Sequence, residues 1–230
     1  MTSHPQTPTS MARRAVILTG LATQPLTILA EIVAAFVVRA PYSFAHNTIS
    51  DLGATTCTDI AYPYGPVPVC SPLHTLVNGS FILFGALLAV GAIAVFPLLP
   101  KGFGRVAGVA LLVVAGLSSL ASGLIPLDID IVGHSLVSLP VFLAQPLALV
   151  VLGVVLRRSA LTGARVLSQA GIVAGAIGLI AGTVFLGWID LPAHGGTLER
   201  LALWPGSLWF AALAAALTRK EGKRRATLTP

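Results

Sequence analysis

The sequence predicts an all-α membrane protein, a bundle of six transmembrane helices with both termini in the cytoplasm. Three observations support this fold class. The chain is 55% hydrophobic and only 10% charged, whereas a soluble domain carries about 25% charged residues. Six apolar segments have the length of a bilayer-spanning helix. The connections between them alternate between basic and non-basic, as the positive-inside rule requires.

The apolar segments follow one another with short connections, apart from one long loop after the first. Each is about 17–24 residues long, near the length that crosses the hydrocarbon core of a bilayer. The last segment is the shortest and contains Pro205, so we expect it to be kinked or to begin late. The expected helices cover residues 15–38, 76–99, 104–126, 136–156, 167–188 and 201–218.

The basic residues set the predicted orientation. Of the 14 Lys and Arg residues, all except Arg39 and Arg200 lie before the first segment, in or beside the second and fourth connections, or after the last segment. Basic connections stay in the cytoplasm. We therefore expect a disordered cytoplasmic leader at 1–14, a transmembrane domain at 15–218 and a basic cytoplasmic tail at 219–230, in a bacterial cytoplasmic membrane. Connections 39–75, 127–135 and 189–200 then face outward.

The long outward loop contains the two cysteines of the chain, Cys57 and Cys70. Disulfides persist on the outer side of a membrane. The spacing fits neither a CxxC redox centre nor a zinc knuckle. We expect a disulfide between these cysteines; two free thiols or a metal pair are the alternatives.

Upstream of the cysteines, Thr48 and Asp51 have the spacing of a capping box, which predicts the start of a short interfacial helix. A helix start alone accounts for both residues. The functional alternative places Asn47, Ser50 and Asp51 in a polar site beside the membrane.

An acidic residue lies inside the first apolar segment. Glu31 is about 10 Å below the outer end of that helix, at a rise of about 1.5 Å per residue. Because a carboxylate in hydrocarbon is costly, such residues face the bundle interior and pair or serve a function. The two interpretations of Glu31 are a hydrogen bond to a neighbouring helix and a functional acid.

Two further outward segments carry ionisable residues. Asp128 and His134 lie in one short turn, and a carboxylate with an imidazole suits acid–base chemistry or a divalent metal. A solvated aspartate and a histidine at a helix start are the structural alternative. Glu199 and Arg200 begin the last helix. An arginine on the outer side departs from the charge rule, which favours a partner for Arg200, either a structural ion pair or an anionic ligand.

Each outward region also contains a histidine that could bind a metal. Three histidines form a known catalytic zinc site, so zinc is a weak alternative, and no other cofactor is expected. The candidate ligands are His74, His134 and His194.

Four outward motifs carry a resemblance to a known family. They are residues 47–53 (Asn-Thr-Ile-Ser-Asp-Leu-Gly), 78–79 (Asn-Gly), 126–128 (Pro-Leu-Asp) with His134 six residues later, and 196–200 (Gly-Thr-Leu-Glu-Arg) leading into Trp204. Over about residues 15–218 the chain resembles small six-helix bacterial membrane proteins catalogued as a domain of unknown function. The resemblance implies the fold and the grouping of the outward ionisable residues, and no activity. A looser likeness is to membrane hydrolases of the alkaline ceramidase and adiponectin receptor type, whose seven helices and HxxxH pair this chain lacks.

These observations predict a polar pocket that opens toward the outer leaflet. The predicted function is an enzyme that acts on a membrane lipid or prenyl-type substrate, by hydrolysis or by acid-initiated cyclisation or isomerisation. One carboxylate would be the general acid, His134 or a second carboxylate the base, and Arg200 would bind negative charge. The candidate catalytic residues are Glu31, Asp51, Asp128, His134, Glu199 and Arg200.

Two other classes of function are weighed against the enzyme. The alternative is a non-catalytic lipid-binding or envelope scaffold protein, in which the outward charges form an ion-pair network. The third is a small transporter, which the scarcity of polar residues in the inner half of the helices disfavours. Nucleic acid is excluded as a partner, because the basic residues fall in short clusters at the ends of apolar runs.

Overall fold

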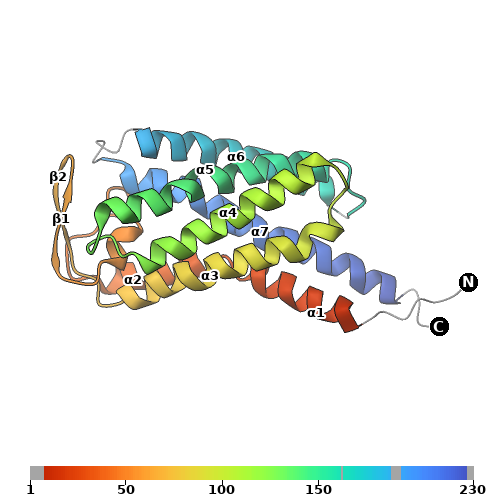
Figure 1. Ribbon diagram of the computed structural model, residues 1–230, viewed down its shortest axis with the longest axis horizontal. Helices are drawn as coiled ribbons and strands as arrows, with labels where there is room; N and C mark the ends of the chain where they lie inside the picture. Colours follow the sequence, from red (N-terminus) through yellow and green to blue (C-terminus); the bar gives the residue numbers. More distant parts are fainter. Residues whose placement is uncertain (1–7, 162, 188–192, 227–230) are drawn as a thin grey trace, which may run out of the picture.

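The computed structural model describes residues 8–161, 163–187 and 193–226. Within these residues, six helical segments are long and apolar enough to cross a membrane, which confirms the predicted six-span bundle. The first helix, α1 (Pro8–Ile17), begins at the same end of the bundle at which the last helix, α7 (Gly195–Ala226), finishes (Figure 1). The spans are Met11–Val37, His74–Leu98, Phe103–Leu124, Ile131–Leu156, Ala164–Gly187 and Gly195–Leu217.

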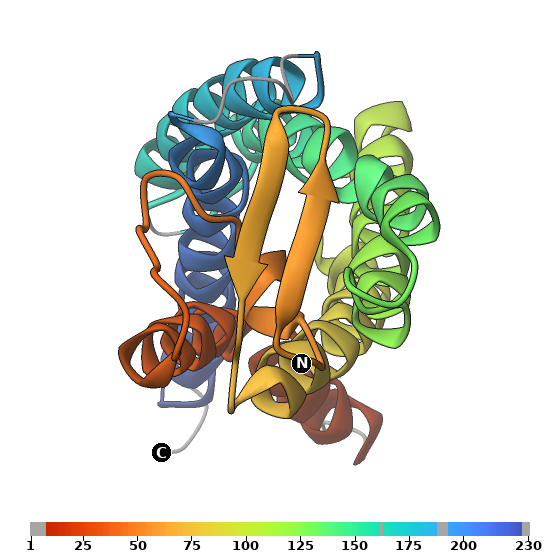
Figure 2. The same cartoon turned by 90° about the vertical axis from the view of Figure 1, so that its left-hand side faces the viewer.

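Helices that follow one another in the sequence also pack against one another. The series runs through α3 (His74–Val95), α4 (Phe103–Leu124), α5 (Ile131–Leu156) and α6 (Ala164–Gly187). Helix α7 packs against α6 and against the first span, which in turn packs against α3, so the helices close into a ring (Figure 2).

The first span is interrupted in its middle. Helix α1 continues as a π-helical turn (Leu18–Ala22), and a second helix, α2 (Leu26–Val37), starts after Pro25. Proline lacks the amide hydrogen that a continuous helix needs there. The Gln24 side chain compensates by donating to the carbonyl oxygens of Gly20 (2.8 Å) and Phe84 (3.0 Å). The expected continuous helix at 15–38 is therefore wrong in detail.

Both ends of the chain contain more helix than expected. Residues 8–14 of the predicted disordered leader belong to α1, and residues 1–7 lie outside the described residues. The last helix was expected at 201–218, but α7 begins at Gly195 and continues through Pro205 to Ala226, into the predicted basic tail.

Small residues, among them the buried Gly171, Gly175, Gly178 and Gly182 of α6, allow the helices to approach closely. An added Cβ at Gly175 would lie 2.5 Å from the Pro146 carbonyl oxygen, and one at Gly182 equally close to that of Phe142. These contacts join α6 to α5. These glycines therefore form a packing face, which is a common role of small residues in membrane helices.

The long loop contains a β-hairpin that the all-α prediction omitted. Strands β1 (Thr58–Tyr62) and β2 (Gly65–Val69) pair antiparallel, with Thr58 opposite Val69 and Tyr62 opposite Gly65. A disulfide between Cys57 and Cys70 closes the base of the hairpin, as predicted from the sequence. The strands lie across one end of the helix ring, which we call the hairpin end (Figure 2).

A small apolar cluster holds the hairpin onto the bundle. Ile60 and Val69 of the two strands pack with Ala54 and with Leu127, which lies just before α5. The hairpin is therefore fixed on one side by apolar contacts and at its base by the disulfide.

The buried ionisable side chains lie at one end of the bundle, and a leucine-rich part of the core lies at the other. Leu152, Leu156, Leu213 and Leu217 belong to the main hydrophobic core, toward the end opposite the hairpin. The buried ionisable side chains are Glu31, Asp51, His134, Glu199 and Arg200. All of these lie toward the hairpin end.

Candidate functional site

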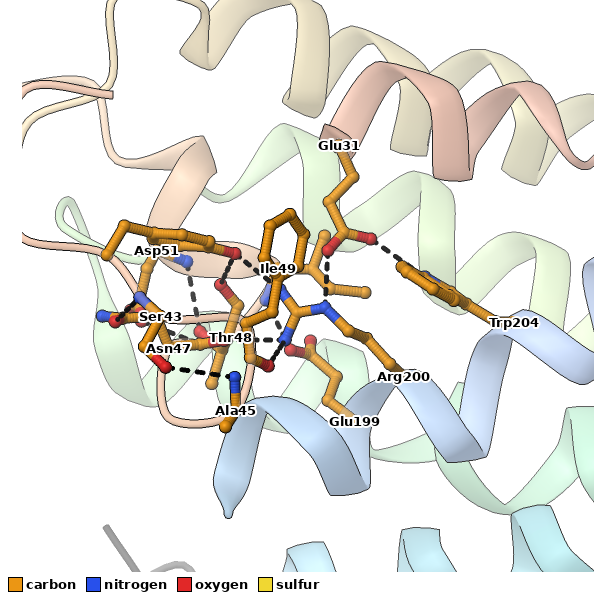
Figure 3. Close-up of polar contacts among 12 residues, drawn as sticks. Glu31, Ser43, Ala45, Asn47, Thr48, Ile49, Asp51, Glu199, Arg200 and Trp204 are labelled. Atoms are coloured by element: carbon orange, nitrogen blue, oxygen red, sulfur yellow. Dashed lines mark hydrogen bonds and ion pairs between the residues drawn. The ribbon is translucent and has the colours of Figure 1, made fainter. Parts of the chain in front are cut away.

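Arg200 is the centre of a buried polar network at the hairpin end (Figure 3). It lies in the second turn of α7, directly below the loop that precedes the hairpin. Its Nε donates to Glu31 Oε1 at 2.7 Å, and its Nη1 donates to the carbonyl oxygens of Phe44 (2.6 Å) and Asn47 (2.9 Å). Its Nη2 donates to the hydroxyl of Tyr42 at 2.5 Å. The guanidinium of Arg200 therefore joins three parts of the chain: the last span, the first span and the loop that follows the first span.

The partner carboxylate of Arg200 is equally well satisfied. Glu31 is 2% exposed, so it faces the interior of the bundle and not lipid. Its second oxygen, Oε2, accepts a hydrogen bond from Trp204 Nε1 at 2.9 Å. Close approach of α7 to the loop depends on Gly196, where a side chain would collide with the carbonyl oxygens of Phe44 and Asn47.

Asp51 holds the loop in its shape. Its Oδ2 accepts from the Thr48 amide (2.9 Å) while the Asp51 amide donates to Thr48 Oγ1 (3.1 Å), which is the reciprocal pattern of the predicted capping box. The short 3₁₀ helix that follows covers Ser50–Gly53. Tyr62 of the hairpin donates to Asp51 Oδ1 at 2.7 Å. Burial raises the pKa of Asp51, and hydrogen bonds from Tyr62, Thr48 and Asn47 act in the opposite direction.

Asp128 holds the segment that leads into β1. Its two oxygens accept from the amides and hydroxyls of Thr55 and Thr56, at 2.9 to 3.0 Å. Partial burial acts to raise the pKa of Asp128, but the hydrogen bonds from Thr55 and Thr56 outweigh it and lower the pKa below the ordinary value. The charged form is therefore the one that the folded protein prefers.

This pKa shift predicts a loss of stability in acid. Because the pKa of Asp128 is lower in the folded than in the unfolded protein, its contribution to stability is present above the unfolded pKa and disappears as the pH falls through the folded pKa. The Asp128→Asn variant should lose stability near neutral pH and show a weaker decline between pH of about 5 and about 2. Thermal unfolding in detergent across this pH range measures both effects. The control is Asp59→Asn, at an exposed position on β1; equal acid profiles for Asp128→Asn and the wild type would contradict the prediction.

His134 and Glu199 both line an internal cavity. His134, in the first turn of α5, contacts the Ile125 carbonyl oxygen through Nδ1 (2.6 Å) and Ser50 Oγ through Nε2 (2.9 Å). Glu199 Oε2 accepts from the Ile49 amide at 2.5 Å. No hydrogen bond to Glu199 Oε1 is found within the described part of the chain.

Two small cavities share Glu199 in their lining. One, of about 80 Å³, lies between the helices and is lined by Glu31, Trp204 and several serines. The other, of about 70 Å³, lies below the hairpin and is lined by Tyr62, Tyr64 and His134. The residues common to both are Ser50, Ser138, Phe142 and Glu199.

Comparison with known proteins identifies the family. Residues 21–216 match the family described as "Protein of unknown function (DUF998)". The chain belongs to the DUF998 family. The match includes all six candidate catalytic residues, and it confirms the resemblance seen in the sequence motifs. No curated protein and no solved structure matches the chain.

The histidines of this DUF998 protein do not form the zinc site that the sequence left open. No group of three or more His, Cys, Asp or Glu side chains suited to a metal ion occurs among the described residues. His74 contacts the Ser71 carbonyl oxygen, and His194 is exposed at the start of α7. The convergence of His74, His134 and His194 on one ion is therefore not observed.

Several residues of the DUF998 site were not among the six candidates. Ser50 was noted only as part of a polar segment, and its position inside the Ser-Asp-Leu-Gly motif was the available signal. Tyr42 and Tyr62, which bind Arg200 and Asp51, had no local signal in the sequence. Asn78 donates to the Gly53 carbonyl oxygen (2.7 Å), which joins two of the resemblance motifs.

Proposed function

We propose that this DUF998 protein is an enzyme that processes a lipid or prenyl-type substrate by acid–base chemistry at its hairpin end. The observation that carries this proposal is the unequal use of the buried polar groups. Arg200, Glu31, Asp51 and Asp128 direct their polar atoms to protein partners. Glu199, in contrast, lines both inner cavities, and no hydrogen bond to its Oε1 is found among the described residues, so we assign it the proton transfer, together with His134.

The hairpin end is proposed to face the extracytoplasmic side of a bacterial membrane. The supporting pattern is the charge of the opposite end, where the connections carry basic residues such as Lys101 and Arg157. Basic segments are retained in the cytoplasm. An outward position also agrees with the disulfide, because disulfides persist in oxidising compartments.

In this proposal the two groups have opposite roles. His134 Nε2 accepts a proton from the attacking group, and Glu199 donates a proton from Oε1 to the leaving group. Each positioned proton transfer contributes about 10²–10⁴-fold to a rate. Glu31, Arg200 and Asp51 are assigned a supporting role, since they fix the loop and the start of α7 on which Ile49 and Glu199 lie.

A surface groove suggests how a membrane substrate is held. The groove lies between α2 and α3, has a volume of about 460 Å³ and is lined mostly by apolar side chains such as Leu29 and Leu83. Phe84 lines both this groove and the inner cavity. The two inner cavities suit a reacting group rather than a whole lipid, so we place the hydrocarbon chain in the groove and the reacting group beside Glu199.

Native mass spectrometry tests the lipid-binding part of the proposal. The purified wild-type protein should carry co-purified lipid, and Gly79→Leu should reduce it by about tenfold, equivalent to about 1.4 kcal/mol. Gly79 lines the groove, and a Cβ there meets no atom within 4 Å, so we expect a leucine side chain at this position to occupy the groove. The matched control is Ala176→Leu at an exposed position of α6. If the wild type carries no lipid, or if Gly79→Leu and Ala176→Leu carry equal amounts of lipid, this part of the proposal is overturned.

Turnover in proteoliposomes tests the catalytic part. The probe is a total bacterial lipid extract, and products are detected by liquid chromatography with mass spectrometry. His134→Asn and Glu199→Gln should each lower product formation by about 10²–10⁴-fold while the melting temperature is kept or raised. Wild-type rates in both variants, with Ala176→Leu as the control for insertion, would contradict the assignment.

The second candidate function is a lipid-binding scaffold without catalysis. It is favoured by the Arg200 network, which closes the hairpin end through four hydrogen bonds from α7 to the first span and to the loop that follows it. The scaffold function is selected if the wild type carries bound lipid but forms no product in the proteoliposome assay.

A further inference from the structure

Ser50 differs from the other serines that line the two cavities. Ser119, Ser122 and Ser138 each donate their hydroxyl hydrogen to a backbone carbonyl oxygen, namely that of Phe81, Ser118 and His134. Ser50 instead contacts the side-chain nitrogen of His134 at 2.9 Å. Ser50 is thus the cavity serine whose hydroxyl is seen to meet a base.

The direction of the Ser50–His134 hydrogen bond follows from the other ring nitrogen. A carbonyl oxygen can only accept, so the 2.6 Å contact to Ile125 requires a hydrogen on His134 Nδ1. In a neutral imidazole, Nε2 then carries a lone pair and accepts. The hydroxyl of Ser50 must therefore donate to Nε2, which is the polarity that an activated serine nucleophile needs.

The position of Ser50 allows it to meet a substrate. It begins the 3₁₀ helix Ser50–Gly53, which is held to α3 by the Asn78 hydrogen bond to Gly53. Its side chain lines both cavities together with Glu199. The orienting carbonyl of Ile125 lies on a different segment from Ser50, so base and nucleophile are fixed independently.

We propose that Ser50 is a nucleophile activated by His134, and that the substrate class is a carboxylic ester of a membrane lipid. This inference rests on the proposed function and specifies its reaction as ester hydrolysis through a covalent intermediate.

The reaction balances with the residues present and water. Ser50 Oγ attacks the ester carbonyl carbon and passes its proton to His134 Nε2. The carbon–oxygen bond to the alcohol breaks, and Glu199 Oε1 donates a proton to the departing alcohol oxygen. Water then attacks the acyl-serine ester and gives a proton to the Glu199 carboxylate. Ser50 leaves the acyl carbon and recovers its proton from His134, so the products are a fatty acid and an alcohol.

Labelling with a fluorophosphonate that carries a dodecyl chain tests the nucleophile without knowledge of the natural substrate. Ser50 attacks the phosphorus, fluoride leaves, and a stable phosphonyl-serine remains. Peptide mass spectrometry of the full-length protein in detergent should locate the added mass on Ser50. Ser50→Ala should abolish the label, and His134→Asn should slow labelling by about 10²-fold or more, with melting temperatures recorded for both.

A neighbouring serine provides the control. Ser135, adjacent to His134 in the sequence, donates its hydroxyl to the Ile131 carbonyl oxygen (2.7 Å), and Ser135→Ala should retain the label on Ser50. An unlabelled Ser50 in folded protein, or equal labelling of His134→Asn and the wild type, would overturn the inference. If Ser50→Ala also retains lipid turnover while Glu199→Gln loses it, the nucleophile is wrong and the proposed acid–base function stands. If neither variant changes turnover, both proposals fail.

Discussion

Replacement of Arg200 by glutamine is expected to destabilise the protein by about 3–5 kcal/mol, the range observed when one partner of a buried ion pair is removed. The variant leaves the Glu31 carboxylate buried with Trp204 as its remaining partner. It also removes the donors that hold the carbonyl oxygens of Phe44 and Asn47. Unpaired buried carbonyl groups carry a further desolvation cost.

A matched control separates this network from a general effect of removing charge. Arg39 is exposed at the start of the same loop, so Arg39→Gln should change stability by no more than about 0.5 kcal/mol. The double variant Glu31→Gln/Arg200→Gln should be more stable than Arg200→Gln alone, because the Glu31 carboxylate is then no longer buried without its partner. Equilibrium unfolding in mixed micelles measures all three. Equal stabilities of Arg200→Gln and Arg39→Gln would show that the network does not hold the hairpin end together.

Substitution of Gly85 by alanine is expected to be the second most disruptive change. Gly85 of α3 faces Gly116 of α4, and an added Cβ would lie 2.5 Å from the Gly116 carbonyl oxygen and 2.6 Å from the Leu120 amide. Both obstacles are backbone atoms, so the helices themselves must separate. Overpacking of this kind costs about 1–3 kcal/mol.

The same helix provides a control for Gly85→Ala. Gly79 lies six residues earlier on α3, and a Cβ there meets no atom within 4 Å. Gly79→Ala should be neutral or stabilising by up to about 1 kcal/mol, because alanine favours the helical backbone. Unfolding of the two variants under identical conditions compares them directly. A loss from Gly79→Ala as large as that from Gly85→Ala would indicate that helix approach is not the cause.

Most of the bundle was predictable because a membrane imposes a length on each helix. The apolar segments had that length, and Glu31 could be placed inside because a carboxylate in hydrocarbon is costly. Local spacing was sufficient for the Thr48 and Asp51 capping box. The interruption at Pro25 also had a local signal, because a proline inside a helix favours a break there.

The remaining features depend on contacts between distant segments. The sequence favoured a partner for Arg200, but the selection of Glu31, 169 residues away, depends on how α2 and α7 pack. Ser50 and His134 are 84 residues apart and meet only because the loop folds under the hairpin. The hairpin itself was missed because Pro66 and Pro68 weaken the strand signal in β2.

These two prolines have a consequence for association between molecules. In an antiparallel pair, alternate residues direct their amides toward the partner strand and away from it. Proline has no amide hydrogen, so Pro66 and Pro68, opposite Ala61 and Asp59, occupy the outward-directed positions. The free edge of β2 therefore offers no donors at those positions with which a strand of another molecule could dock. Pairing of a strand from a neighbouring molecule with β2 is therefore disfavoured at this edge.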